Sequence, residues 1–159
     1  MPATETAGKL RRGAGKETVR RKQMKRTDYF ELLAQLFEFK TVTDELGNEF
    51  VLFRSSPLET VGKIDDKTQF EAVENHIHLL EHIKAFEFEK LCSVSSRLGQ
   101  ALLWSLNANY PDKHFVVFVS LQLHDSMIIR FHQKWEGEEA YYDVSDFRSP
   151  TEKVLMFER

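Results

Sequence analysis

Alternating apolar and polar residues between His114 and Val144 form the clearest pattern in the chain and predict antiparallel strands. Two runs rich in Val, Ile and Phe, FVVFVSLQL and MIIRFHQKW, are separated by the polar turn HDS, and a second turn, EGEE, precedes AYYDV. Short polar turns between alternating runs are typical of β-hairpins. We therefore expect a three-stranded meander whose third strand contains Ala140, Tyr142 and Val144.

The apolar positions also predict the register of the first hairpin. A three-residue loop, HDS, sets apolar residues opposite one another on nearly every rung and pairs Val119 with Phe131. A two-residue loop would set Val119 against Arg130, so we favour the longer turn. One face of the meander is then apolar, and the other carries Ser120, Gln122, Arg130, His132, Lys134, Tyr141 and Asp143.

Upstream of this region the pattern predicts helices and one further hairpin. Asp28 is a candidate cap for a short helix that ends near Phe37. The runs FEFKTVT and EFVLFRS alternate on either side of DELGN and predict a hairpin. From Thr68 to Tyr110 apolar residues recur with helical spacing, which predicts two helices or one bent helix. Near the C-terminus, KVLMF predicts a fourth strand at an edge of the sheet.

Together these elements predict an α+β fold. We expect an N-terminal helix and β-hairpin, a central long or bent helical segment, and a C-terminal antiparallel meander of three to four strands with helices on one face. The length of 159 residues and the apolar content of 42% suit one domain, which we place at residues 27–159. Residues 1–26 are expected to form a disordered basic arm. Met24 leaves open a second interpretation, in which the arm is an upstream extension of a domain that starts there.

Charge is divided unevenly along the chain. Residues 1–26 hold nine Lys or Arg against two Glu, a net charge of +7, whereas residues 27–159 hold 13 against 23 Asp or Glu, a net charge of −10. An acidic body attracts basic proteins, and a basic arm attracts nucleic-acid phosphates. We therefore expect a protein partner, such as a basic toxin or nuclease, and keep nucleic-acid contact through the arm as the alternative. The sequence does not define the oligomeric state.

Cysteine content and hydropathy indicate the compartment. The only cysteine, Cys92, excludes an internal disulfide and fits a reducing environment. No apolar run approaches the roughly 18 residues needed to cross a bilayer, and the N-terminus lacks the apolar segment of a secretory signal. We therefore expect a cytoplasmic protein without a membrane span.

Motifs of known catalytic chemistry are missing from the sequence. It contains no G-x-G-x-x-G, Walker loop, C-x-x-C or G-x-S-x-G, so we expect no cofactor and favour a binding module over an enzyme. The leading hypothesis is an immunity-like or antitoxin-like inhibitor that covers a basic toxin or nuclease. Trp104 falls on the polar side of its predicted helix, where a large aromatic residue can anchor a partner. We expect an interface of Trp104 with the carboxylates Glu136, Glu138, Glu139 and Asp143.

An enzymatic alternative uses the polar face of the meander. Arg130, His132 and Tyr141 share that face and suit a metal-independent phosphodiesterase, with His as acid or base and Arg stabilising negative charge. The structural interpretation of the same residues is an ion pair between Arg130 and Asp143 beside a stack of His132 on Tyr141. The acidic body favours the structural interpretation, because it repels phosphodiesters.

A metal site is the third alternative. Glu74, His78 and His82 are spaced one helical turn apart in ENHIHLLEH, which is the spacing of helical zinc ligands. The glutamate of H-E-x-x-H is absent, and a solvated helix face accounts for the same residues. We therefore expect no metal. His76 falls among the apolar positions of this segment and is expected to lie in the core or at an interface.

Overall fold

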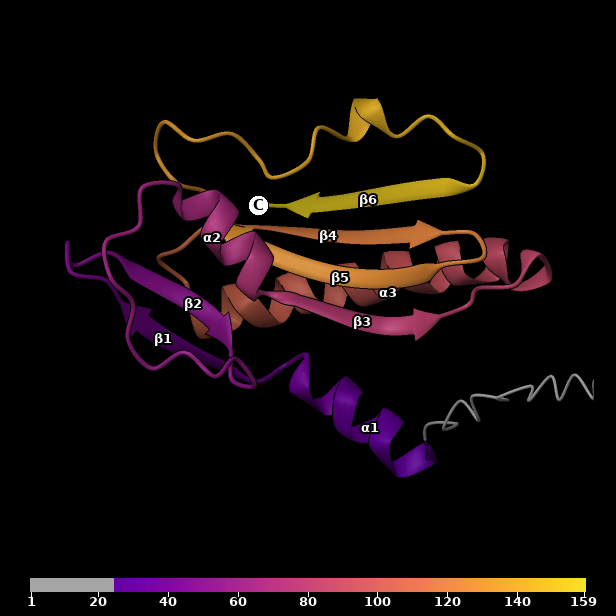
Figure 1. Ribbon diagram of the computed structural model, residues 1–159, viewed down its shortest axis with the longest axis horizontal. Coiled ribbons are helices and arrows are strands. Elements are labelled where there is room, and N and C mark those ends of the chain that lie inside the picture. The colour runs from indigo at the N-terminus through magenta and orange to yellow at the C-terminus, as the bar shows by residue number, and fades with distance from the viewer. Residues whose placement is uncertain (1–24) are drawn as a thin grey trace, which may run out of the picture.

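The computed structural model describes residues 25–159, which form three helices and two antiparallel sheets (Figure 1). This architecture confirms the predicted α+β fold. The elements in chain order are α1 (Arg26–Gln35), β1 (Phe39–Thr43), β2 (Glu49–Phe53), α2 (Lys67–Glu74), β3 (His76–Glu81), α3 (Ala85–Asn109), β4 (Phe115–Gln122), β5 (Ser126–Gln133), a 3-10 helix (Val144–Asp146) and β6 (Glu152–Glu158).

The first helix and the hairpin after it occupy the expected places. The N-cap of α1 is Lys25, three residues before the predicted cap Asp28, and the carboxylate of Asp28 accepts the backbone N–H of Lys25 at 3.2 Å. β1 and β2 pair around a turn in which Asp44 accepts the backbone N–H of Asn48 at 2.8 Å and Gly47 has a φ of +83°. A left-handed φ at this position suits glycine, so the sequence DELGN closes the predicted hairpin. Apart from Lys25 and Arg26, the predicted basic arm lies outside the described residues.

The four-stranded sheet has the order β3-β5-β4-β6, and the pairing of its central hairpin differs by two residues from the predicted register. Val119 pairs with Ile129 rather than with Phe131, because the three-residue loop comprises residues 123–125. His124 in this loop has a φ of +66°, the left-handed conformation that three-residue hairpin loops use. A shift of two residues leaves every side chain on its predicted face. Accordingly, Met127 and Phe131 are buried in the core.

The prediction of helix was wrong for residues 75–84. α2 ends at Glu74, Asn75 follows as its C-cap, and the next six residues form β3, which pairs along β5 at the edge of the sheet. Within β3, Ile77 and Leu79 contact the core whereas His76 and His78 are exposed. The run HIHL therefore fits the two-residue period of a strand. The free edge of β5 offers backbone hydrogen bonds to this segment, and these favour a strand over a helix.

The third strand of the predicted meander is also absent. Residues 140–144 form no strand, and β6, from the predicted edge segment KVLMF, pairs with β4 instead. The segment between β5 and β6 places Tyr141 and Tyr142 over the sheet face opposite α3, where the Tyr142 ring lies 5.3 Å from that of Phe118. The face predicted to be polar and solvated is therefore partly covered.

The core lies between α3 and the four-stranded sheet, with α3 behind the sheet in the view of Figure 1. Leu102 and Leu106 of α3 pack there against Val117, Ile129 and Phe131. A smaller apolar cluster joins the hairpin to α2 through Phe50, Phe70 and Trp135, and the Phe50 ring lies 4.9 Å from that of Phe70. Among residues 25–159, no helix is long and apolar enough to cross a bilayer.

Two buried polar side chains bond to the edge of β2, namely Glu71 of α2 and Asn75 at its C-terminal cap, and Glu71 also joins β2 to β5. Asn75 accepts the backbone N–H of Phe53 at 2.9 Å and donates to the carbonyl of Val51 at 2.8 Å. Glu71 accepts the backbone N–H of Val51 at 2.9 Å on one side and that of Gln133 at 2.7 Å on the other. These side chains satisfy the backbone groups at the outer edge of β2, which would otherwise be buried without partners.

Candidate functional site

Trp104 and two of the carboxylates proposed for a partner, Glu138 and Glu139, line three hollows, each of which shares residues with the next. The first hollow, of about 410 Å³, is next to the start of α2 and is lined by Asp65, Asp66, Thr68, Gln69, Glu138, Glu139, Ala140 and Tyr141. The second, of about 280 Å³, shares Glu138 and Glu139 with the first and extends to Glu158. The third, of about 470 Å³, is lined by Glu158 and Trp104. We call these hollows the acidic groove, defined by Asp65, Asp66, Glu138, Glu139, Glu158 and Trp104.

The first hollow is held in place by Glu138 and the N-terminus of α2. The Glu138 carboxylate accepts the backbone N–H of Thr68 at 2.7 Å and lies 2.8 Å from the ammonium of Lys67. Burial raises the pKa of Glu138, but hydrogen bonds from Lys67 and Thr68 outweigh it and lower the pKa to about 2. Glu138 is therefore negatively charged near neutral pH, and it ties the loop after β5 to α2.

The other predicted carboxylates differ in where they lie. Glu139 is exposed and lines both hollows that contain Glu138. Glu136 is exposed on the preceding turn, outside the groove lining. Asp143 is also outside it, and its carboxylate accepts the backbone N–H of Ser145 at 2.8 Å, which lowers the pKa of Asp143. The structure therefore places Glu138 and Glu139 in the first two hollows and Trp104 in the third, linked only through Glu158, and it leaves Glu136 and Asp143 outside the lining.

Trp104 forms the apolar end of the groove. Its side chain is 67% exposed, because it points away from the face of α3 that carries the buried Leu102, Leu103 and Leu106. The hollow beside it is lined by Gln100, Leu103, Asn107, Ala108, Glu158 and Arg159. The side-chain oxygen of Asn107 is buried and has no hydrogen-bond partner among the described residues. A partner that fills this hollow therefore meets an exposed indole.

Sequence reasoning missed part of the groove. It did not include Asp65 and Asp66 among the partner contacts, and Asp66 also accepts the backbone N–H of Gln69 at 2.8 Å. It did not consider Glu158, which ends β6 and lies 2.7 Å from the ammonium of Lys134. No local pattern marks Glu158, because its place between the hollows depends on the pairing of β6 with β4.

Comparison with known proteins places the chain in a family without assigning an activity. A family model, described as the uncharacterized protein PM0498 family, matches residues 17–159. The chain belongs to this family. No curated protein matches the sequence. No solved structure matches it either. What this member of the PM0498 family does must therefore be argued from its own residues.

In this PM0498 family member, the residues of the enzymatic alternative meet, but in an arrangement unsuited to proton transfer. His132 is 1% exposed, its Nε2 accepts the backbone N–H of Tyr141 at 3.2 Å, and its Nδ1 lies 2.7 Å from the carbonyl of Gln133. Burial lowers the pKa of His132, so the neutral ring donates from Nδ1 and accepts at Nε2. Both ring nitrogens are thus occupied, which leaves none for a substrate.

Arg130 also differs from its predicted role. Among the ion pairs of residues 25–159, none joins Arg130 to Asp143, so the predicted cross-strand pair was wrong. The Cζ atom of Arg130 instead lies 4.8 Å from the ring centre of Tyr141 and 5.2 Å from that of Tyr142. Because residues 140–144 are not a strand, Asp143 has no register partner on β5.

The residues of the metal alternative lie on three different segments. Glu74 is at the end of α2, His78 is in β3, and His82 follows β3 with a φ of +59°. The one-turn spacing that suggested a metal site requires a helix, and β3 removes it. Within residues 25–159, no group of three or more His, Cys, Asp or Glu is suited to hold a metal ion. His76 is exposed, so the core position expected for it was wrong, and a place at an interface stays a prediction.

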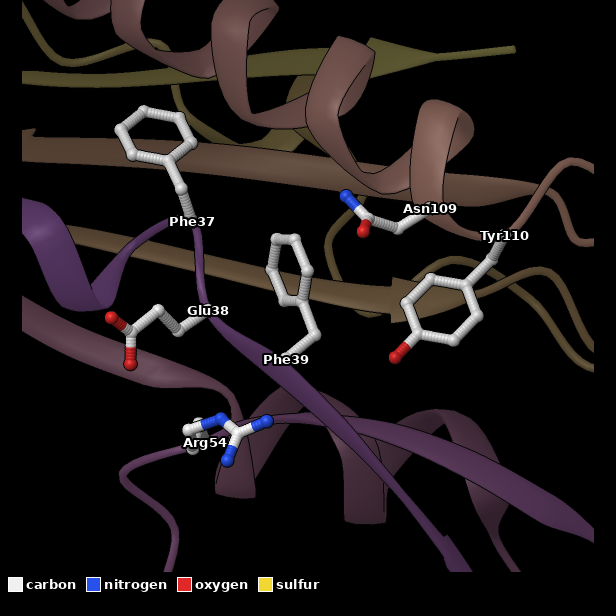
Figure 2. A pocket seen from close by; sticks show the side chains of 6 residues that line it. All are labelled: Phe37, Glu38, Phe39, Arg54, Asn109 and Tyr110. Atoms are coloured by element: carbon white, nitrogen blue, oxygen red, sulfur yellow. The ribbon is translucent and has the colours of Figure 1, made fainter.

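A further hollow of about 510 Å³ lies where α1, the β1–β2 hairpin and the end of α3 meet, and is lined by Phe37, Glu38, Phe39, Arg54, Asn109 and Tyr110 (Figure 2). Figure 2 shows Phe39 between Phe37 and Tyr110. The Phe39 ring lies 5.8 Å from that of Phe131, so the floor of this hollow is the edge of the core. With one acidic and one basic side chain, it offers no preference for the charge of a partner.

Proposed function

We propose that the protein is a non-catalytic binding module that takes a basic segment of another protein into the acidic groove. The observation that carries this proposal is a series of three hollows in which Glu138 and Glu139 line the first two, Glu158 lines the second and third, and the exposed Trp104 lines the third. Basic side chains in the lining are fewer, namely Lys134 and Arg159. The groove therefore favours a partner of positive charge.

Two of the carboxylates are available to a partner. Asp65, Glu138 and Glu158 already pair with Lys63, Lys67 and Lys134. By contrast, no ion pair between residues 25 and 159 involves Asp66 or Glu139. Glu139 is exposed and has no structural bond to lose, so we assign it the main charge contact of the partner. Trp104 supplies the apolar contact, since buried Trp side chains dominate the energy of many interfaces.

The finer proposal is an inhibitor of the immunity or antitoxin type. Enzymes that bind nucleic acid present positively charged surfaces to phosphates, and a module with an acidic groove complements such a surface. The net charge of −10 over residues 27–159 adds long-range attraction for the same partner. A covering inhibitor needs no catalytic group, which is in keeping with the occupied ring nitrogens of His132.

Affinity capture followed by calorimetry tests this function. The full chain is immobilised at low salt, retained proteins are identified, and each is purified for titration. We expect a basic protein whose dissociation constant rises at least about tenfold on Trp104→Ala and on Glu139→Lys, with steep salt dependence. Phe86→Ala and Glu45→Lys are matched controls, because both residues are exposed and lie outside the groove lining, and they should change affinity by less than about twofold.

The same experiment can reject the proposal. Retention of no protein at low salt would contradict it, since charge attraction is strongest there. A partner that binds Trp104→Ala and Glu139→Lys as tightly as the unaltered chain would show that another surface is used. An acidic partner would exclude the inhibitor hypothesis in particular.

A further inference from the structure

Arg130, at the centre of the four-stranded sheet, is a buried cation without an anionic partner. Its side chain is 9% exposed, and its Nε is buried without a hydrogen bond. None of the side-chain hydrogen bonds or ion pairs formed within residues 25–159 involves its guanidinium. A guanidinium is always charged and carries five N–H donors, and buried charges in proteins are ordinarily paired. This side chain therefore lacks the partner that its burial calls for.

The two tyrosines that cover Arg130 do not supply that partner. Their ring centres lie 4.8 and 5.2 Å from Cζ of Arg130 and 4.7 Å from each other. An aromatic face attracts the cation as a whole, but it offers no lone pair to the N–H groups. Tyr141 and Tyr142 thus hold the guanidinium in place and leave its donors unused.

The sheet around Arg130 also lacks a carboxylate. Its cross-strand neighbours are His76 on β3 and Phe118 on β4, and Ile128 and His132 are the next residues of β5 on the same face. His78 shares the face and is exposed, with its ring 5.6 Å from that of His76. Burial raises the pKa of Tyr142 and the charge of Glu152 adds to this rise, but Glu152 makes no ion pair with Arg130 in the part of the chain that the structure describes. The side chains next to Arg130 on this face are therefore neutral or basic.

We propose that Arg130 forms an oxyanion site for a phosphate group, framed by Tyr141 and Tyr142 and flanked on β3 by the exposed His76 and His78. The planar fork of a guanidinium matches two oxygens of a phosphate, which gives paired, charge-assisted hydrogen bonds. The phosphate is either free or carried by a small ester such as a mononucleotide. The site binds without cleaving, because both nitrogens of the neighbouring His132 are occupied. This site is on the sheet face, adjoins the acidic groove through Tyr141 and His132, and does not depend on the proposed protein partner.

The side-chain N–H of Arg130 provides the readout. The full chain, labelled with ¹⁵N, is titrated with inorganic phosphate and, at matched ionic strength, with chloride, while the Nε–Hε signal of Arg130 is followed. We expect a saturable shift with phosphate and none with chloride, together with movement of the ring signals of Tyr141 and Tyr142. Adenosine 5′-monophosphate distinguishes the two sources. If adenosine 5′-monophosphate saturates the signal at a concentration at least about tenfold lower than inorganic phosphate does, the natural ligand is a phosphate ester. If the two ligands saturate it at the same concentration, the ligand is the free ion.

Variants make the test specific to Arg130. Arg130→Lys keeps the charge but removes the fork, so it should weaken phosphate binding at least about tenfold. Arg130→Gln should abolish binding, and Arg54→Gln, at an exposed arginine elsewhere, should leave it unchanged. If Arg130→Gln fails to fold, Arg130→Lys carries the comparison. Shifts that grow linearly and equally with phosphate and chloride, or binding that persists in Arg130→Lys with unchanged affinity, would overturn the proposal.

Discussion

The Glu71 carboxylate receives two hydrogen bonds from Gln133, one from the backbone amide at 2.7 Å and one from the side-chain amide at 2.6 Å. It also accepts the backbone N–H of Val51 at 2.9 Å and the indole N–H of Trp135 at 3.0 Å. Glu71 is fully buried, so one carboxylate joins α2, the edge of β2 and the end of β5. We assign Glu71 a structural role, because no solvent or substrate reaches it.

Removal of this carboxylate should be costly. Glu71→Ala leaves the donors of Val51, Gln133 and Trp135 without an acceptor, and each buried orphan donor costs about 1–3 kcal/mol. We expect the free energy of unfolding to fall by about 3 kcal/mol or more, measured by urea denaturation at pH 7. The control is Glu74→Ala on the same helix, which should cost less than about 1 kcal/mol. Equal losses in the two variants would contradict the role of Glu71.

Glu71 should also make stability depend on pH. Burial raises its pKa to about 7, in spite of the hydrogen bonds from Gln133, whereas an unfolded glutamate titrates near 4.5. Between these values the folded protein holds a proton that the unfolded chain has lost, so this contribution is complete below about pH 4.5 and is lost as the pH rises through 7. The stability of the unaltered chain relative to Glu71→Gln should fall by up to about 3 kcal/mol over this range. A difference that is constant with pH would contradict the shift.

The elements that could be predicted are those whose local sequence pattern fits only one type of secondary structure. The hairpin around Gly47 and the buried face of β4 and β5 follow from alternation and turn chemistry, and a register error of two residues did not alter which side chains are buried. β3 could not be distinguished from helix, because HIHLLE satisfies both periods over so short a length. The open edge of β5, which decides between them, is a tertiary feature.

The candidate site was predictable only in part, for a similar reason. Trp104 stands out in the sequence because it falls on the polar side of a helix, and it is 67% exposed. The bond of Glu138 to the start of α2 joins residues 70 positions apart, and no local pattern encodes it. The burial of His132 beneath Tyr141 likewise depends on how the loop after β5 crosses the sheet.

Glu138 should affect stability with the opposite pH dependence to Glu71. Hydrogen bonds from Lys67 and Thr68 outweigh burial and lower its pKa to about 2, so its contribution is present above about pH 4.5 and is lost as the pH falls through 2. At this partly exposed site, Glu138→Gln should cost about 1–2 kcal/mol at pH 7 and nearly nothing at pH 2. Glu139→Gln, at the adjacent exposed residue, should leave stability unchanged at both pH values. Chemical denaturation at the two pH values checks this prediction.

Trp104 should be dispensable for folding. Its indole is 67% exposed, so Trp104→Ala should change the free energy of unfolding by less than about 0.5 kcal/mol. Leu102→Ala, two residues away on the buried side of α3, should cost about 2–5 kcal/mol because it opens a cavity in the core. Thermal unfolding of both variants gives the comparison. A large loss in Trp104→Ala would mean that any weakening of partner binding reflects misfolding rather than a lost contact.

Gly99 should tolerate no side chain while Phe157 faces it. Gly99 lies on the buried side of α3, and an added Cβ would overlap Cε2 of the Phe157 ring on β6 and lie 2.6 Å from Cδ2. Alanine normally stabilises a helix relative to glycine by about 1 kcal/mol, so propensity alone predicts a gain. Overpacking of a buried contact costs about 1–3 kcal/mol, and we expect this effect to be the larger.

A double-mutant cycle separates the two effects at Gly99. Gly99→Ala should lower the free energy of unfolding by about 1–2 kcal/mol in the unaltered chain. With Phe157→Leu in the background, the smaller side chain makes room for the methyl group, so the same substitution should become neutral or stabilising. Urea denaturation of the four proteins yields the coupling energy. If Gly99→Ala were stabilising in both backgrounds, α3 and β6 would have to move apart at little cost. The close packing of Gly99 on Phe157 would then not be what holds Trp104 beside the end of β6.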